Sequence, residues 1–190
     1  MIEGRIRLGW TLSAALLLGT CGSAWAEKVK LATSMGDIVL ELHRDKAPKT
    51  VENFLQYVKA GHYDGTVFHR VIDNFMIQGG GMTADLSEKS TQAPIALESR
   101  NGLNNVRGSV AMARTADPNS ATSQFFINLK DNAFLDAANA RDGNGYAVFA
   151  KVVEGMAVVD KIKTVATGNR GPHGNVPTEP VIIRKATLEK

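Results

Sequence analysis

The chain has 190 residues, of which 44% are hydrophobic, and this length suits one domain with a sizeable core. Its 22 Lys and Arg residues against 19 Asp and Glu residues give a formal net charge of +3. The charges are scattered along the sequence rather than gathered into a basic stripe with interleaved aromatic residues. The length leaves no room for a second domain, and the charge pattern argues against a nucleic-acid partner.

The first 26 residues have the features of a secretory signal peptide. Arg5 and Arg7 make a short basic start, and residues 8–19 form a mainly apolar run. Ala24-Trp25-Ala26 is a small-x-small pattern at which a signal peptidase would cut. We therefore expect export to the periplasm and cleavage that leaves one domain, residues 27–190.

Two alternatives to a cleaved signal are less favoured. A membrane anchor needs about 20 consecutive apolar residues, and the run over residues 8–19 is shorter. A lipid anchor on Cys21 is disfavoured because Thr20 stands where a small residue such as Gly or Ala is expected. Cys21 is the only cysteine, so the exported domain has no thiol for a disulfide or a metal site. We expect this domain to be a monomer with no membrane contact.

The exported domain begins with a predicted hairpin and a predicted helix. Residues 29–33 and 38–42 are short β-leaning segments that a turn-like Ser-Met-Gly-Asp cluster separates. Residues 48–59 change period, because their apolar side chains recur at i, i+3, i+4 and i+7. Pro48 suits the first turn of this helix, and Gly61 suits its end.

Short strand-like segments dominate the remaining sequence. They are residues 67–72, 75–78, 109–113, 125–129, 146–153 and 181–188. A second helical pattern covers residues 156–163. Residues 82–106 are irregular for long enough to suggest a function. Many short strands with two separated helices favour a mostly β structure, closed and largely antiparallel, with the helices covering its ends.

Several motifs, taken in order and spacing, resemble the signature segments of the cyclophilin family. They are Phe68-His69-Arg70-Val71-Ile72, Phe75-Met76-Ile77-Gln78-Gly79-Gly80, Ser123-Gln124-Phe125-Phe126-Ile127 and Phe134-Leu135-Asp136. The resemblance covers essentially residues 29–188. It implies an eight-stranded closed antiparallel β-barrel capped by two α-helices, peptidyl-prolyl cis/trans isomerase activity, and no need for a metal or cofactor.

Arg70 matches the catalytic arginine of that family. Rotation about a prolyl amide has a barrier of roughly 18–20 kcal/mol, because the planar amide has partial double-bond character. In the twisted transition state the prolyl nitrogen becomes a hydrogen-bond acceptor, and a fixed donor aimed at it lowers the barrier. A guanidinium suits this task because it stays protonated. Without the resemblance, Arg70 would pass for a solvated surface residue.

The resemblance also assigns positions that contact the substrate. The apolar ones, which would form a dry pocket for the proline ring, are Phe75, Met76, Phe126 and Leu135. Those expected beside the extended peptide are Gln78, Ala113, the backbone of Arg114, and Gln124. Without the resemblance the apolar residues would be ordinary core residues. The expected partners are proline-containing unfolded or exported polypeptides.

Three positions depart from the commonest eukaryotic pattern of the family. Phe134 stands where many members have a tryptophan that touches the drug cyclosporin, Tyr146 lies near a usual histidine, and Arg114 replaces a usual asparagine. The segment from Arg114 to Gln124 is also one residue longer. These departures are similar to those of bacterial periplasmic cyclophilins. They predict weak cyclosporin binding and leave the proline pocket almost unchanged, and we count Phe134 and Tyr146 among the expected substrate-binding residues.

Other functions fit the sequence less well. A chaperone or scaffold that holds proline peptides is the main alternative, but it would not need the donor at Arg70. A carrier of a small apolar ligand is disfavoured because the family's barrel interior is filled by side chains. Gly79-Gly80-Gly81 lacks the Lys-Ser/Thr of a phosphate-binding loop. His43, His62 and His173 have no metal-ligand spacing.

Overall fold

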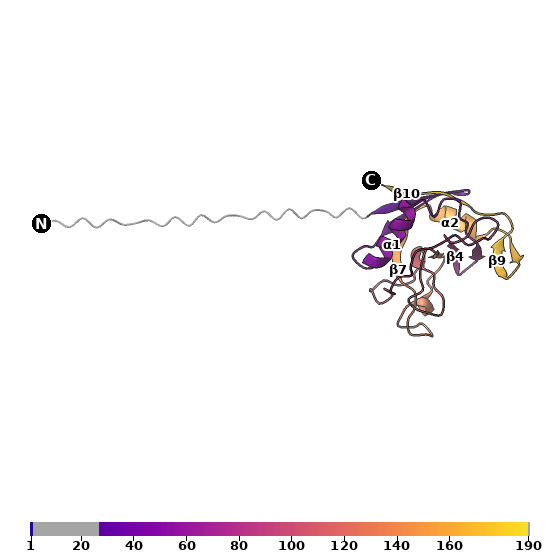
Figure 1. The fold of residues 1–190 in the computed structure, drawn as a ribbon. Coiled ribbons are helices and arrows are strands. Elements are labelled where there is room, and N and C mark those ends of the chain that lie inside the picture. The colour runs from indigo at the N-terminus through magenta and orange to yellow at the C-terminus, as the bar shows by residue number, and fades with distance from the viewer. Residues whose placement is uncertain (2–26, 190) are drawn as a thin grey trace.

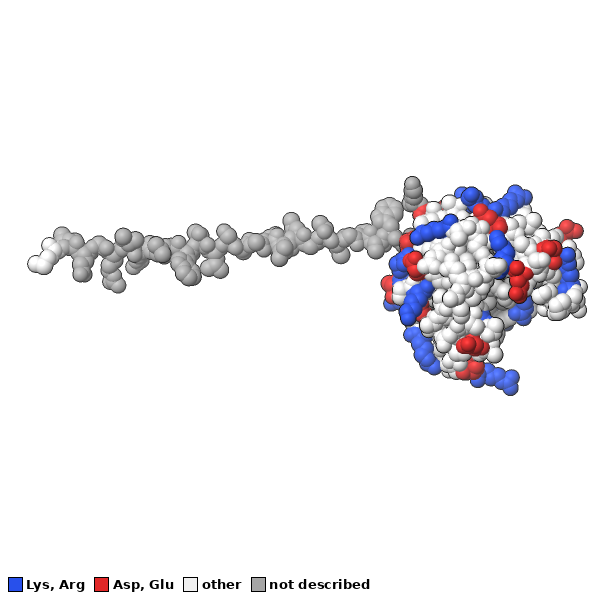
Figure 2. All heavy atoms as spheres, viewed as in Figure 1, with Lys and Arg blue, Asp and Glu red and all other residues white. Residues whose placement is uncertain are grey.

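A computed structural model of the chain describes residue 1 and residues 27–189. The predicted signal peptide lies outside the described residues, apart from its first one. Figure 1 shows the folded part, with α1 (Pro48–Lys59) on one side and the hairpin of β8 (Thr167–Arg170) and β9 (His173–Pro177) on the opposite side. On the face in Figure 2, basic and acidic side chains are interspersed.

One antiparallel sheet organises this part of the chain. Its order is β10-β1-β2-β7-β5-β6-β4-β3, so it contains eight strands. The strands are β1 (Lys28–Thr33), β2 (Gly36–Leu42), β3 (Arg70–Ile72), β4 (Met76–Gly79), β5 (Ser109–Met112), β6 (Phe125–Asn128), β7 (Val148–Glu154) and β10 (Ile183–Glu189). Each overlaps a segment that the sequence predicts to be a strand, so the mostly β prediction is confirmed.

The prediction of a closed barrel is wrong, because the sheet is a curled half-barrel. Its edge strands β3 and β10 form no ladder with each other. The edges approach at one isolated bridge between Val67 and Ile182, where Phe68 N–H donates to Val181 O at 2.9 Å. The contact does not extend into a ladder because β3 is only three residues long and begins after the bridge. Pro180, which has no backbone N–H, precedes the contact on the other side.

Both predicted helices are confirmed, as α1 (Pro48–Lys59) and α2 (Met156–Lys163). The apolar stripe of α1 is buried, and Phe54 packs at 5.0 Å between ring centres against Phe149 of β7. On α2, Val159 and Ile162 are buried in the same core. In the described part of the chain, neither helix nor any other is long and apolar enough to cross a membrane.

The sequence did not reveal three short elements. They are the hairpin of β8 (Thr167–Arg170) and β9 (His173–Pro177) and the 3₁₀ helix η1 (Ala133–Leu135). Every residue of β8 is exposed, so it has no alternation of apolar and polar residues to signal a strand. A 3₁₀ helix of one turn is too short to show a period.

The long irregular stretch of residues 82–106 is attached to the start of α1. The residue before the helix is Ala47, which has no side chain that could cap it. Glu98, which is far from the helix in the sequence, supplies the missing acceptors. Its carboxylate accepts hydrogen bonds from the backbone N–H groups of Lys49 at 3.2 Å and Thr50 at 2.8 Å, and from the Thr50 hydroxyl at 2.7 Å. The carboxylate thus satisfies free N–H groups at the positive end of the helix.

Candidate active site

The pairing of β3, β4 and β6 places the predicted catalytic and substrate-binding residues on one face. Arg70 is paired with Gln78, and Gln78 is paired with Phe126 on its other side. Side chains of directly opposed residues lie on the same face of a sheet, as do those two residues apart in one strand. Met76 therefore shares this face, whereas Ile77 points into the main core and is fully buried.

A pocket of about 170 Å³ opens on this face. It is lined by Arg70, Phe75, Met76, Gln78, Ala113, Arg114, Phe126, Leu135 and Tyr146. Met76, Phe126 and Leu135 are nearly buried and belong to a small apolar cluster separate from the main core. The pocket therefore has an apolar floor with cationic and amide groups beside it.

All but two of the residues assigned to the site from the sequence line this pocket. Gln124 lies beside it, because Gln78 Nε2 donates a hydrogen bond of 2.9 Å to Gln124 Oε1. Phe134 lies outside, with 56% of its surface exposed, and stacks on Phe75 with ring centres 5.7 Å apart. The structure thus brings the predicted residues together, and their contacts with a substrate stay predictions.

Arg70 is only loosely held within the protein. Its Nη1 donates one long hydrogen bond, of 3.4 Å, to Gln78 Oε1. Among the described residues, no carboxylate lies within 4.0 Å of its guanidinium. Gln78 is in turn oriented by Gln124. A half-buried guanidinium with most of its donors uncommitted can therefore serve a ligand in the pocket.

Arg114 and Tyr146 form a tightly bonded edge of the pocket. The Arg114 side chain is 3% exposed and forms an ion pair with Asp142. Its guanidinium carbon lies 4.6 Å from the centre of the Tyr146 ring. Hydrogen bonds from Asn144 N–H, the Arg114 side chain and Gly145 N–H lower the pKa of Asp142 to about 2. The sequence marks residues 142–145 only as a turn between strands, so it assigned no function to Asp142.

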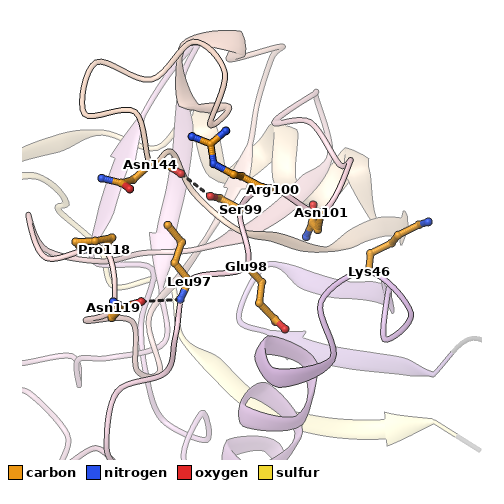
Figure 3. A pocket seen from close by; sticks show the side chains of 9 residues that line it. All are labelled: Lys46, Leu97, Glu98, Ser99, Arg100, Asn101, Pro118, Asn119 and Asn144. Carbon is orange, nitrogen blue, oxygen red and sulfur yellow. Dashed lines mark hydrogen bonds between the residues drawn. The ribbon is translucent and has the colours of Figure 1, made fainter.

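A larger hollow, of about 510 Å³, lies near Asn144 (Figure 3). Its rim includes the exposed cations Lys46 and Arg100, and Glu98 is directed from it toward α1. Ser99 Oγ donates a hydrogen bond of 2.5 Å to Asn144 O. The hollow contains neither Arg70 nor an enclosed apolar floor, so the smaller pocket is the better candidate for a proline ring. In the described part of the chain, no group of three or more His, Cys, Asp or Glu side chains could hold a metal ion.

Comparison with known proteins identifies the family. The family model described as cyclophilin type peptidyl-prolyl cis-trans isomerase/CLD matches residues 28–188. The chain belongs to the cyclophilin family. A peptidyl-prolyl cis-trans isomerase of Streptomyces antibioticus is 61% identical over 161 residues, which cover 84% of this chain and 97% of that protein. Isomerase B of Escherichia coli is 55% identical over 163 residues, which cover 85% of this chain and 99% of that protein.

The similarity extends to solved structures. A cyclophilin-type isomerase of Cryptosporidium parvum has a TM-score of 0.73 at 25% identity, covering 87% of this chain and 99% of that one.

A third relative by sequence is the peptidyl-prolyl cis-trans isomerase A of Dickeya dadantii, which is 54% identical, with 85% of this cyclophilin and 84% of that protein covered. The enzymatic class of this cyclophilin is therefore peptidyl-prolyl cis-trans isomerase.

Proposed function

We propose that this cyclophilin accelerates rotation about X–Pro bonds by gripping the proline ring in the 170 Å³ pocket and donating a hydrogen bond from Arg70 to the prolyl nitrogen. The observation that carries the proposal is that Arg70 borders the apolar floor while most of its donors have no partner among residues 27–189. A related Cryptosporidium parvum isomerase, with a TM-score of 0.72, was crystallised in the presence of the dipeptide Ala-Pro. That ligand has the chemistry that the pocket suits.

The free-energy requirement fits one such donor together with the pocket. Turnover of about 10³ s⁻¹ instead of exchange over about 100 s needs about five decades of rate, or roughly 7 kcal/mol. A preorganised donor used mainly in the transition state supplies about 2.7–4 kcal/mol. The pocket supplies the rest by fixing one end of the rotating bond and excluding water.

Replacing the donor tests the proposal. We expect Arg70→Ala to lower kcat/KM by about 10²–10³ with a smaller loss of peptide affinity, because the donor acts mainly on the twisted amide. Arg70→Lys should restore only part of the rate, since an ammonium lacks the planar fork. Arg184→Ala, at an exposed arginine of β10, is the matched control and should change neither quantity.

A protease-coupled or NMR exchange assay gives the rate, and titration with an Ala-Pro peptide gives the affinity. If Arg70→Ala keeps near-wild-type isomerisation while losing binding, Arg70 clamps the substrate and the donor mechanism is wrong. Near-wild-type values for both would also refute the donor mechanism, because turnover would not need Arg70. Tight peptide binding with little acceleration by the wild-type chain would favour the alternative function, a scaffold that holds proline peptides with incidental turnover.

We further propose that this cyclophilin is of the periplasmic type and assists the folding of exported proteins. The support is the signal-like sequence of residues 1–26, which precedes the family match at residue 28. Expression of the full chain in a bacterium, followed by intact-mass measurement, should show a periplasmic protein that begins at Glu27. A retained leader, or a lipid on Cys21, would contradict this proposal.

Weak binding of cyclosporin belongs to the same proposal. Phe134 is 56% exposed and stacks on the pocket residue Phe75, which places it at the rim. A phenyl ring has no N–H donor, whereas the indole of tryptophan has one. Phe134→Trp should therefore strengthen inhibition by cyclosporin. Equal inhibition curves for the two proteins would mean that this position does not contact the drug.

A further inference from the structure

We infer that Arg114, paired with Asp142, is a positioning residue that holds the Tyr146 wall of the proline pocket. This inference rests on the proposed function and refines it, because it assigns Arg114 a role through Tyr146 instead of a side-chain contact with the peptide. Three sets of contacts carry it: those of the guanidinium, those of the tyrosine ring, and those of the loop between them.

The Arg114 guanidinium is committed to protein acceptors through all three of its nitrogens. Nε donates to Gly145 O at 2.9 Å, Nη1 donates to Thr115 O at 2.9 Å, and Nη2 donates to the Asp142 carboxylate. The Arg114 side chain is 3% exposed, whereas that of Asp142 is 42% exposed, so the guanidinium is shielded from water more than its carboxylate partner is. In its hydrogen bonding Arg114 is the opposite of Arg70, whose one hydrogen bond within the described part of the chain is long, at 3.4 Å.

The guanidinium carbon of Arg114 lies over the Tyr146 ring. The distance from the guanidinium carbon to the ring centre is 4.6 Å, which is within the range of a cation–π contact. The Tyr146 ring also contacts Phe126 of the pocket floor edge to face, with ring centres 5.6 Å apart and an angle of 80° between the ring planes. The ring that borders the pocket is thus held between a cation and the apolar floor.

The loop that carries Tyr146 has little freedom of its own once Asp142 is in place. Asp142 Oδ1 accepts hydrogen bonds from Asn144 N–H at 2.9 Å and Gly145 N–H at 3.2 Å, while Oδ2 pairs with Arg114. Gly145 has a φ of +65°, and a Cβ there would lie 2.6 Å from Leu135 O. The loop backbone is therefore in close contact with η1 and has no room to shift toward it. Under this constraint, the Arg114–Asp142 pair can set the distance between Tyr146 and the pocket floor.

The expected kinetic signature differs from that of the catalytic donor. The pocket wall grips the proline ring in the planar and in the twisted state alike, so its displacement weakens uniform binding. Loss of Arg114 should therefore raise KM, whereas loss of Arg70 should lower kcat. If Arg114 acts only through Tyr146, replacing Arg114 should have no further effect on KM once Tyr146 has been removed.

A double-mutant cycle with matched single variants tests the inference. Arg114→Met should raise the KM and the Kd for an Ala-Pro peptide about tenfold, with kcat within about threefold. Asp142→Asn keeps the acceptor of the turn and removes the charge partner, and should raise both about two- to threefold. The control is Asp117→Asn, because Asp117 caps a similar exposed turn without an arginine, and it should have no effect. In a Tyr146→Ala background, Arg114→Met should add nothing.

The outcomes separate the possible roles. Equal effects of Arg114→Met with and without Tyr146 would show direct contact with the peptide and overturn the inference, as would unchanged KM and Kd in both single variants. Arg114→Lys and Asp142→Asn keep the test decisive if Arg114→Met does not fold by circular dichroism. Because Kd is measured by titration, the result stands even if the Arg70 experiment refutes the isomerase mechanism.

Discussion

His69 should make the stability of this cyclophilin sensitive to mild acid. Its side chain is 6% exposed, and its Nδ1 has no hydrogen-bond partner among the described residues. Burial, reinforced by the nearby positive charges of His173 and Arg70, lowers the pKa of His69 to about 4. The neutral imidazole is therefore the form that the folded structure accommodates.

The sign and size of the effect follow from linkage. In the unfolded chain the pKa of a histidine is about 6.5, so between pH 6.5 and pH 4 the unfolded state binds more protons than the folded state. Stability is fully present above this window and is lost as the pH falls through it. A difference of about 2.5 pKa units corresponds to at most about 3 kcal/mol, of which about 2 kcal/mol is lost by pH 5. This is a large part of the 5–15 kcal/mol that typically stabilises a domain.

Urea unfolding at pH 7.5 and pH 5.0 measures this loss directly. His69→Phe keeps an aromatic ring of similar size but cannot be protonated, so carboxylate titrations contribute equally to both proteins. We expect the wild-type free energy of unfolding to fall by about 2 kcal/mol more than that of the variant between the two pH values. Equal losses in the two proteins would refute the argument, because they would show that His69 titrates normally in the folded state.

Three further substitutions should act on stability, and thermal or urea unfolding measures each of them. Glu98→Gln weakens the remote cap of α1 and should cost about 1 kcal/mol. Gly155→Ala should lower the free energy of unfolding by at least about 2 kcal/mol, because φ is +87° and the added Cβ would overlap a backbone oxygen of β2. The control is Gly168→Ala, where the Cβ would meet open space and stability should change little. Asn132→Ala removes a buried amide that donates to Phe75 O at 2.9 Å, and it should lower the free energy of unfolding by about 2 kcal/mol. A change near zero would mean that a water molecule replaces the amide.

Local sequence patterns were sufficient for the regular elements. The 3.6-residue period of residues 48–59 and 156–163 predicted both helices with the bounds that the structure has. Alternation and turn residues located all eight strands of the main sheet. The motifs around Arg70 and Phe126 placed most pocket residues, because β3, β4 and β6 carry them on strands whose two-residue period fixes which side chains share a face.

Contacts between distant segments were beyond any local pattern. The open edge between β3 and β10, the capping of α1 by Glu98 and the pairing of Arg114 with Asp142 each join residues far apart in the chain. An ionised side chain in a loop has the same sequence appearance whether it is solvated or paired, because its partner is chosen by how the sheet curls and which loops then meet. The pocket residues were therefore readable from the sequence, whereas the bonds that hold the pocket wall in place were decided only by the tertiary structure.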